Sequence, residues 1–347
     1  MPLYFLSSSK SSDTSQPSGN HCSYNSYISS PSVTLEIINK YGVNLKKRWG
    51  QNFLIDTNVA KKIVRHAHLK ENDTVLEIGS GIGGLTEIML QNVRKIVCIE
   101  LDNLLVKIFS DIFSGEIGKK IELIHADALK IDYWELNARH TPNKIVSNLP
   151  YCIASPLILK LLLEAKGIDF MIVTIQKDIA DRLVSSPGSK DYNSYTVKAN
   201  FLGQFDILFM VSRNCFIPRP NVDSVVVKIT KKDSNNMVEK LMEGIKGEKK
   251  ESVRETEWRR KQELRGMEKN EEKNELKEIE KFFNFIDTCF SQRRKKLINT
   301  LARSFTWLKE KESFVLQTLS SIGKNQNVRA EELSLEDYIF LYRNLFI

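Results

Sequence analysis

Between about residues 56 and 230, short apolar runs alternate with stretches in which apolar positions recur every three or four residues. Strand-length runs separated by amphipathic segments are typical of a parallel sheet with helices on both faces. The expected strands are residues 75–78, 95–100, 121–125, 144–147, 170–175, 205–211 and 222–229. The expected helices are residues 57–68, 84–91, 102–112, 155–164 and 177–184. The pattern predicts an α/β domain with a Rossmann-like, seven-stranded sheet.

The two ends of the chain differ from this middle part. Residues 1–34 are serine-rich and lack a periodic apolar pattern, which predicts a disordered leader that is either an organelle transit peptide or a plain tail. Residues 231–280 carry as many acidic as basic side chains, which predicts a charged helical linker. Helical patterns at residues 283–302 and 333–345 then divide the chain into a main domain at 35–230 and a small all-α domain at 281–347.

Composition narrows the choice of partners. The chain has 51 Lys+Arg and 43 Asp+Glu, a net charge of +8, which favours a polyanionic partner because basic side chains release counterions from phosphates. The five cysteines are isolated and lack zinc-ligand spacing, so reduced thiols and no structural metal are expected. No apolar run approaches the roughly 18 residues that a membrane span requires, so no membrane partner is expected.

A glycine-rich turn follows the strand at 75–78, with Gly79, Gly81 and Gly84 in G-x-G-x-x-G spacing. Glycine permits a tight turn and a close approach of the backbone to a ligand. Glu100 ends the next strand, where a carboxylate can accept hydrogen bonds from two ribose hydroxyls, and Asp127 follows the third strand at the adenine end of the crevice. The turn has no basic residue for a pyrophosphate. A phosphate-free adenosine cofactor is therefore favoured, while a dehydrogenase or a plain strand-to-helix turn remains an alternative.

The fourth strand ends in Asn148, Leu149, Pro150 and Tyr151. The Asn148 side-chain oxygen and the Leu149 carbonyl provide two acceptors that the fixed φ of Pro150 holds in place. Two acceptors suit the exocyclic amine of adenine, because they orient its nitrogen for in-line attack on an activated methyl group. Tyr151 is placed to stack on an extruded base. In isolation the tetrapeptide is more often a simple Asn-Pro turn, but its position after the glycine loop and Glu100 favours a catalytic role.

From about Lys46 to its C-terminus the chain resembles the ribosomal RNA adenine dimethyltransferase family. These S-adenosylmethionine-dependent enzymes dimethylate adjacent adenines near the 3′ end of small-subunit rRNA. The resemblance rests on motifs in the same order at residues 47–54, 79–84, 99–102, 127–128, 148–151, 216–224, 292–296 and 329–331. It implies a cofactor site formed by Asn52, Leu54, Gly79, Gly81, Glu100, Asp127 and Asn148. It also implies that Tyr151 and Phe216 sandwich the target adenine, although the residues alone leave Phe216 equally well a core side chain.

The resemblance further implies that the C-terminal helical domain helps to dock rRNA. A basic run at Arg293, Arg294, Lys295 and Lys296, on an expected helix, and a second cluster at Lys46, Lys47 and Arg48 suit this role, although such runs are often only solvated faces. We therefore expect the small-subunit rRNA or the pre-ribosomal small subunit as partner, and a monomer.

Two other members of the methyltransferase fold compete with this interpretation. One is a mitochondrial transcription factor that binds nucleic acid without depending on methyl transfer, and the intact tetrapeptide speaks against it. The other is a resistance-type methylase of large-subunit rRNA, which the stretch at 216–224 and the long C-terminal region disfavour. The Gln-Asn-Phe-Leu form of residues 51–54 is similar to the bacterial and organellar branch. Together with the leader it predicts a mitochondrial or plastid location, and otherwise the cytoplasm.

Overall fold

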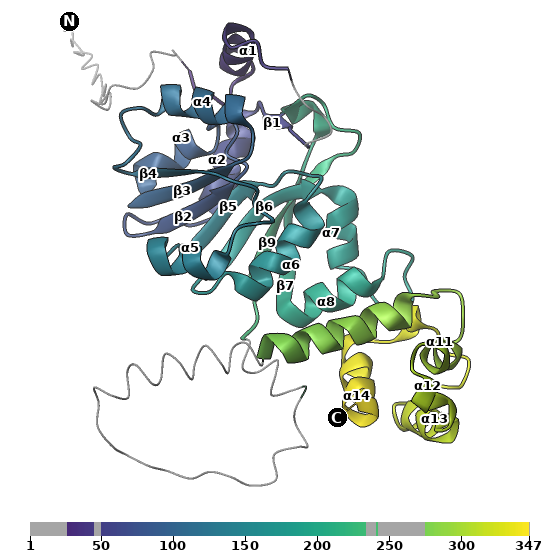
Figure 1. The fold of residues 1–347 in the computed structure, drawn as a ribbon. Coiled ribbons are helices and arrows are strands. Elements are labelled where there is room, and N and C mark those ends of the chain that lie inside the picture. The colour runs from purple at the N-terminus through teal and green to yellow at the C-terminus, as the bar shows by residue number, and fades with distance from the viewer. Residues whose placement is uncertain (1–25, 45–49, 234–240, 242–274, 347) are drawn as a thin grey trace, which may run out of the picture.

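The computed structural model describes residues 26–44, 50–233, 241 and 275–346. Its centre is a seven-stranded sheet in the order β4-β3-β2-β5-β6-β9-β7 (Figure 1). The strands are β2 (Thr74–Ile78), β3 (Lys95–Glu100), β4 (Ile121–His125), β5 (Lys144–Asn148), β6 (Phe170–Gln176), β7 (Gly203–Val211) and β9 (Ser224–Lys231). All seven expected strands are present, and the predicted fold class is confirmed.

The sheet is mixed rather than parallel. Strands β2 to β6 run parallel to one another, whereas β9 pairs antiparallel with both β6 and β7. The link between β7 and β9 contains no α-helix, and a parallel crossover usually needs one. The strand order reverses between β2 and β5, so the carboxyl ends of these two strands open a crevice of the kind that binds ligands in α/β proteins.

Helices cover both faces of the sheet. One apolar core contains side chains of α1 (Pro31–Lys40), α2 (Thr57–His66), α3 (Thr86–Met89) and α4 (Asn103–Ile112). The other contains side chains of α5 (Tyr133–His140), α6 (Ala154–Glu164), α7 (Lys177–Leu183) and α8 (Ser194–Leu202). Strand residues alternate between the cores, since Val75 belongs to the first and Leu76 to the second. Burial on both faces explains why the parallel strands are nearly continuous apolar runs.

Helix α1 corrects the predicted leader. The expected boundary at residue 34 lies inside this helix, and residues 26–34 are ordered, so the prediction of disorder is wrong for them. The Ser30 side chain caps the helix, a proline occupies its first position, and Val33 and Ile37 bury one face. The apolar pattern of this helix was not recognised, because it consists of few buried positions next to a serine-rich stretch. Residues 1–25 of the predicted leader lie outside the described residues.

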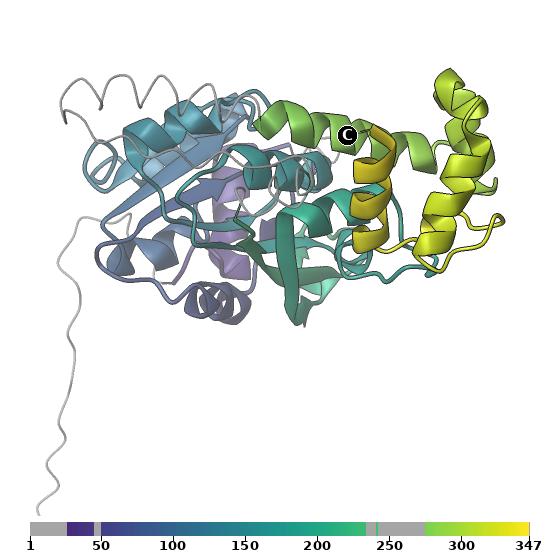
Figure 2. The same cartoon turned by 90° about the horizontal axis from the view of Figure 1, so that it is seen from below.

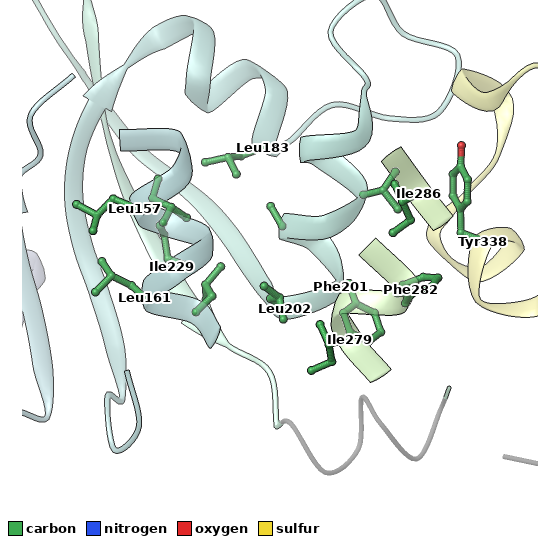
Figure 3. Packing of buried hydrophobic residues seen from close by; sticks show 14 of the residues in the cluster. Leu157, Leu161, Leu183, Phe201, Leu202, Ile229, Ile279, Phe282, Ile286 and Tyr338 are labelled. Carbon is green, nitrogen blue, oxygen red and sulfur yellow. The ribbon is translucent and has the colours of Figure 1, made fainter. Parts of the chain in front are cut away.

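The C-terminal helices lie at the end of the molecule away from β4 (Figures 1 and 2). They are the helix at residues 275–290, α11 (Leu297–Ser304), α12 (Thr306–Lys309), α13 (Glu312–Ser321) and α14 (Leu335–Phe346). The ring centroid of Phe282 lies 5.0 Å from that of Phe201 in α8, so these helices continue the core of the main domain (Figure 3). The expected domain boundary at residue 280 therefore lies inside a helix.

A turn at residues 291–296 interrupts the single helix that was expected over 283–302. Apolar positions resume directly after this turn with Leu297, Ile298 and Leu301 in helical spacing, which is why the break was not predicted. The backbone N–H of Leu297 instead donates to the Val328 carbonyl at 2.8 Å, a tertiary contact that the local pattern does not encode. Within the described ranges, no helix is long and apolar enough to span a membrane.

Candidate active site

A cavity of about 210 Å³ opens at the carboxyl ends of β2, β3 and β5. Its walls include every residue predicted to hold the cofactor: Asn52, Leu54, Gly79, Gly81, Glu100, Asp127 and Asn148. The strand register explains how residues so far apart in the chain meet. Ile78 of β2 pairs with Ile99 of β3, so the glycine loop begins beside Glu100, and β5 brings Asn148 to the other side of the crevice.

The glycine loop packs directly against the tetrapeptide. Gly79 has a φ of +74°, and a Cβ atom there would lie 2.9 Å from the Cγ of Pro150. Both the backbone conformation and the lack of space require glycine at this position. The turn after β2 and the end of β5 therefore form one continuous wall of the cavity.

Glu100 is held by three backbone amides. Its Oε2 accepts from the Gly81 N–H at 2.9 Å, and its Oε1 accepts from the N–H groups of Leu101 at 2.8 Å and Asp102 at 2.9 Å. Burial raises the pKa of Glu100, and these amide donors oppose the shift. Asp127 also lines the cavity, and its Oδ1 accepts from the Leu129 N–H at 3.0 Å. Two carboxylates are thus fixed on the cavity wall with defined orientations.

The orientation of the Asn148 amide is determined by Asn52. The Nδ2 of Asn148 donates to the backbone carbonyl of Asn52 at 2.9 Å. A carbonyl only accepts, so the amide NH2 must face it and the Oδ1 atom must point the other way. This Oδ1 is buried and has no hydrogen-bond partner among the described residues. It is therefore available as an acceptor inside the site.

A second cavity of about 260 Å³ adjoins the first. The two share Gly50, Asn52 and Cys152 in their walls. The second is lined further by Tyr151, Gln176, Pro218, Arg219, Pro220 and Asn221. Gly50 has a φ of +65°, and a Cβ atom there would lie 2.8 Å from the Tyr151 nitrogen. Only glycine therefore allows the backbone at residue 50 to pack this closely against the backbone at residue 151. The arrangement offers one chamber for a cofactor and a neighbouring one for a second reactant.

The two aromatic candidates occupy different places. Tyr151 lines the second cavity, and its hydroxyl lies 2.6 Å from Ser224 Oγ. Phe216 is buried behind it, in the short strand β8 (Phe216–Ile217), which pairs with β1 (Phe53–Leu54). The two rings are 6.3 Å apart and meet edge to face at 71°, so they do not present parallel faces to a base. The sandwich of an adenine between them stays a prediction. Leu149 is buried, and the role of its carbonyl also stays a prediction.

The pattern of the family described as ribosomal RNA adenine dimethylase matches residues 42–243. This segment covers more than half of the 347-residue chain and contains both cavities' polar residues. The chain belongs to the ribosomal RNA adenine dimethylase family. The resemblance inferred from the sequence motifs is thereby confirmed.

This dimethylase is similar to named relatives along most of its length. It is 33% identical over 318 residues to the ribosomal RNA small subunit methyltransferase A of Geobacillus thermodenitrificans, which covers 90% of this chain and 95% of that protein. It is 35% identical over 316 residues to the protein of the same name from Listeria monocytogenes, which covers 90% and 94%. The crystal structure of a dimethyladenosine transferase from Plasmodium falciparum shares the fold, with a TM-score of 0.60, 22% identity and coverage of 82% and 94%.

Enzymes of this family use S-adenosylmethionine, which is the cofactor of this dimethylase. The cavity fits the group, because two buried polar atoms in its wall, Asn148 Oδ1 and Ser80 Oγ, have no partner among the described residues and can bond to a polar ligand. Glu100 and Asp127 offer further acceptors to the hydroxyl and amino groups of an adenosine. When bound, the cofactor supplies an electrophilic methyl group on a sulfonium centre.

Several site residues were not predicted. Ser80 is hidden within the glycine loop, and Gln51 lies in a motif from which only its neighbours were chosen. The Gln51 Nε2 donates to Asp102 Oδ2 at 3.0 Å, so residues 50–54 reach from the end of β3 to the end of β5. Ile28 also lines the cavity, from a segment that was assigned to the leader. The motifs around Ser80 and Gln51 could have identified these two residues, whereas no local sequence signal marks Ile28, which joins the site through its long-range contact with Glu87.

Glu77 of β2 lines the cofactor cavity, and its side chain is buried. Its Oε2 accepts from the Thr86 hydroxyl at 2.6 Å. Burial raises the pKa of Glu77 from 4.5 to about 8, and the nearby carboxylate of Glu100 adds to the shift. The folded protein therefore holds a proton on Glu77 in a pH range where the unfolded chain has lost it. Stability must decrease as pH rises through this range.

We expect Glu77→Gln to reduce this pH dependence, because glutamine resembles the protonated acid at every pH. Between about pH 6 and about pH 9, the melting temperature of the cofactor-free parent should fall further than that of the variant, by on the order of 5 °C. Thermal unfolding followed by circular dichroism measures the difference. Glu36→Gln, on the exposed side of α1, is the matched control and should follow the parent. Parallel curves for parent and Glu77→Gln would contradict the assignment.

The predicted RNA-binding residues have different environments. Lys46, Lys47 and Arg48 lie outside the described residues. Arg293, Arg294, Lys295 and Lys296 are exposed, but in the turn after the helix at 275–290 and not on a helix as expected. Arg293 forms an ion pair with Glu331, and its Nη2 donates to the Lys190 carbonyl at 2.7 Å. This arginine therefore fastens the C-terminal helices to the loop that follows α7.

Proposed function

We propose that this dimethylase transfers two methyl groups to each of two adjacent adenines near the 3′ end of small-subunit rRNA. The observation that carries the proposal is the buried, unpartnered Oδ1 of Asn148 beside the wall shared by the two cavities. An exocyclic amine that enters through the second cavity can donate a hydrogen bond to Asn148 Oδ1 in the wall of the cofactor cavity. The names of the bacterial relatives, small subunit methyltransferases, support the choice of RNA.

The proposed chemistry needs orientation rather than a strong base. Asn148 Oδ1 accepts one N–H of the adenine amine, and the Leu149 carbonyl is the proposed acceptor for the other. With both N–H bonds directed this way, the nitrogen lone pair points out of the ring plane toward the methyl group. When bound, the cofactor would supply the methyl group, its C–S bond would break as the new N–C bond formed, and the methylated amine would release its proton to solvent.

Tyr151 is the proposed stacking surface for the base. An adenine in an RNA helix must leave its stack before its amine can reach Asn148. The Tyr151 hydroxyl is hydrogen-bonded to Ser224, which holds the ring in the wall of the second cavity. Burial raises the pKa of Tyr151 to about 12, so the ring stays neutral when it meets the base.

The test of the proposal is to map methylated adenines in rRNA. Unmethylated small subunits, isolated large subunits and naked rRNA are incubated with the enzyme and labelled cofactor, and the labelled nucleotides are located by mass spectrometry. We expect dimethyladenosine at two adjacent positions near the 3′ end of the small-subunit RNA. Label confined to large-subunit RNA, or absent from all three substrates, would refute the proposal.

The exposed basic turn is the proposed RNA-docking surface. Replacement of Arg294, Lys295 and Lys296 together by alanine should weaken RNA binding. The slope of log K against log salt concentration should become shallower by about 2 to 3, because up to three phosphate contacts are lost.

Arg293→Ala should instead lower the melting temperature, since it removes a half-exposed ion pair worth about 1 kcal/mol and a hydrogen bond to the main domain. RNA affinity at two salt concentrations and thermal unfolding of both variants separate the roles. Unchanged RNA affinity in the triple variant would place the docking surface elsewhere.

The proposed setting is a monomeric enzyme that acts on the pre-ribosomal small subunit of a mitochondrion or plastid, and otherwise in the cytoplasm. The serine-rich leader and the bacterial relatives support an organelle of bacterial descent. Residues 1–40 fused to a fluorescent protein should direct it to that organelle. A diffuse signal throughout the cytoplasm would contradict this part of the proposal.

A further inference from the structure

A segment that precedes the matched family pattern closes one wall of the cofactor cavity. Ile28 lines this cavity and is only 3% exposed, although the family pattern begins at residue 42. Its neighbours Ser29 and Thr34 are 1% and 0% exposed. The burial of these three side chains indicates that Ile28, Ser29 and Thr34 pack as part of the folded enzyme.

Hydrogen bonds to two different helices fix this segment in place. The Ile28 N–H donates to Glu87 Oε2 in α3 at 2.7 Å. The Ser29 hydroxyl donates to the hydroxyl of Thr57, the first residue of α2, at 3.2 Å. The Thr34 hydroxyl donates to the Ile28 carbonyl at 2.6 Å and so connects Ile28 to helix α1. Ile28 is therefore held through both its backbone N–H and its backbone carbonyl.

The segment also packs against the glycine loop. A Cβ atom on Gly84 would lie 3.6 Å from the Cβ of Ser29, an ordinary van der Waals separation. Ile28, Val33 and Ile37 share an apolar cluster with Ile82, which lies within the turn, and Leu85, which follows it. A displacement of Ile28 would therefore both open the cavity to water and remove support from the loop that faces the cofactor.

We propose that Ile28 is a positioning residue for S-adenosylmethionine, and that residues 29–40 are required to hold it in the wall of the cofactor site. Ile28 supplies apolar surface that excludes water from the cavity, and Glu87 holds it there through the backbone. The proposal rests on the cofactor of the family and not on the identity of the RNA. It has a consequence for processing, because a mature form of the protein that has lost Ile28 lacks part of its cofactor site.

The first test measures binding of S-adenosylhomocysteine by calorimetry. Ile28→Ala should raise the Kd about tenfold, because the cavity loses apolar contact and admits water. In methyl-transfer assays its KM for S-adenosylmethionine should rise by a similar factor while kcat changes less than about twofold. Leu35→Ala, on the exposed side of α1, is the matched control and should leave both constants unchanged.

The second test separates a positioning role from a contribution to folding. Ile28→Phe keeps the apolar surface but intrudes into the cavity, so it should weaken binding while the melting temperature without ligand stays close to that of the parent. A chain that begins at Ser26 should bind S-adenosylhomocysteine like the full chain. A chain that begins at Pro31 should show a much smaller ligand-induced rise in melting temperature.

The outcomes distinguish this inference from the proposed function. Parental affinity in Ile28→Ala, Ile28→Phe or the chain that begins at Pro31 would overturn the role of Ile28, whichever RNA is methylated. Failure of the parent itself to bind S-adenosylhomocysteine would overturn it together with the cofactor assignment. Methylation of a different RNA by a parent that binds the cofactor normally would refute only the proposed substrate.

Discussion

Replacement of Asn148 by alanine is expected to lower the kcat for rRNA methylation by about 10²- to 10³-fold, which is the usual cost of removing a preorganised polar group from a reacting centre. Asn148 Oδ1 is the buried acceptor that faces the site, and the Asn52 carbonyl holds its amide in that orientation. The loss should fall on the chemical step. Affinity for S-adenosylhomocysteine should decrease only about fivefold, as for one hydrogen bond.

Single-turnover methylation of small-subunit RNA, with calorimetry on the same samples, measures both quantities. Asn92→Ala is the matched control, because Asn92 is exposed and its side-chain amide donates to the Ile88 carbonyl of the preceding turn at 3.4 Å. It should methylate at the parental rate. An Asn148→Ala enzyme with parental kcat would show that other groups orient the amine. The proposed function would then lose its main structural support, the acceptor role of Asn148 Oδ1.

Replacement of Glu100 by alanine should have the largest effect on cofactor binding. We expect the Kd for S-adenosylhomocysteine to rise about 100-fold, because the ribose loses a charged acceptor. The same change leaves the N–H groups of Gly81, Leu101 and Asp102 without their acceptor. A loss of about 2 to 3 kcal/mol in the free energy of unfolding should follow, as expected for buried donors left unpaired.

Calorimetry and urea denaturation of the variant provide the two measurements. Glu122→Ala is a suitable control, since Glu122 lies one strand away in β4 and forms a partly exposed ion pair with Lys95. Glu122→Ala should bind S-adenosylhomocysteine with parental affinity and lose at most about 1 kcal/mol in the free energy of unfolding. If Glu100→Ala retained parental affinity, Glu100 would serve only to anchor the backbone at the end of β3.

Local sequence was sufficient for the features that depend on neighbouring residues. Strand-length apolar runs predicted all seven strands, most clearly β2, β3, β5, β6 and β9, because strands buried on both faces tolerate few polar side chains. The glycine loop and the tetrapeptide were recognisable because each needs special backbone residues at adjacent positions. Residues at the carboxyl ends of neighbouring strands were then expected to meet in one crevice, as Gly79, Glu100 and Asn148 do.

The tertiary structure decided how distant segments complete the site. The pairing of β1 with β8 places Leu54 at the cofactor and Phe216 behind Tyr151, and neither two-residue strand has a periodic signal of its own. Asn52 orients Asn148 through a backbone carbonyl, which carries no information about residue type.

The ends of the described chain illustrate the same limit. Arg293 stands in a basic run that suggests RNA binding, yet Glu331 and the Lys190 carbonyl engage it in a contact between parts of the protein. Ile28 stands in a serine-rich stretch that suggests disorder, yet Glu87 fixes it in the cofactor wall. Composition and periodicity describe how a residue relates to its neighbours in the chain. Contacts across the fold depend on where the packed sheet and helices bring that residue, and only the three-dimensional structure shows this.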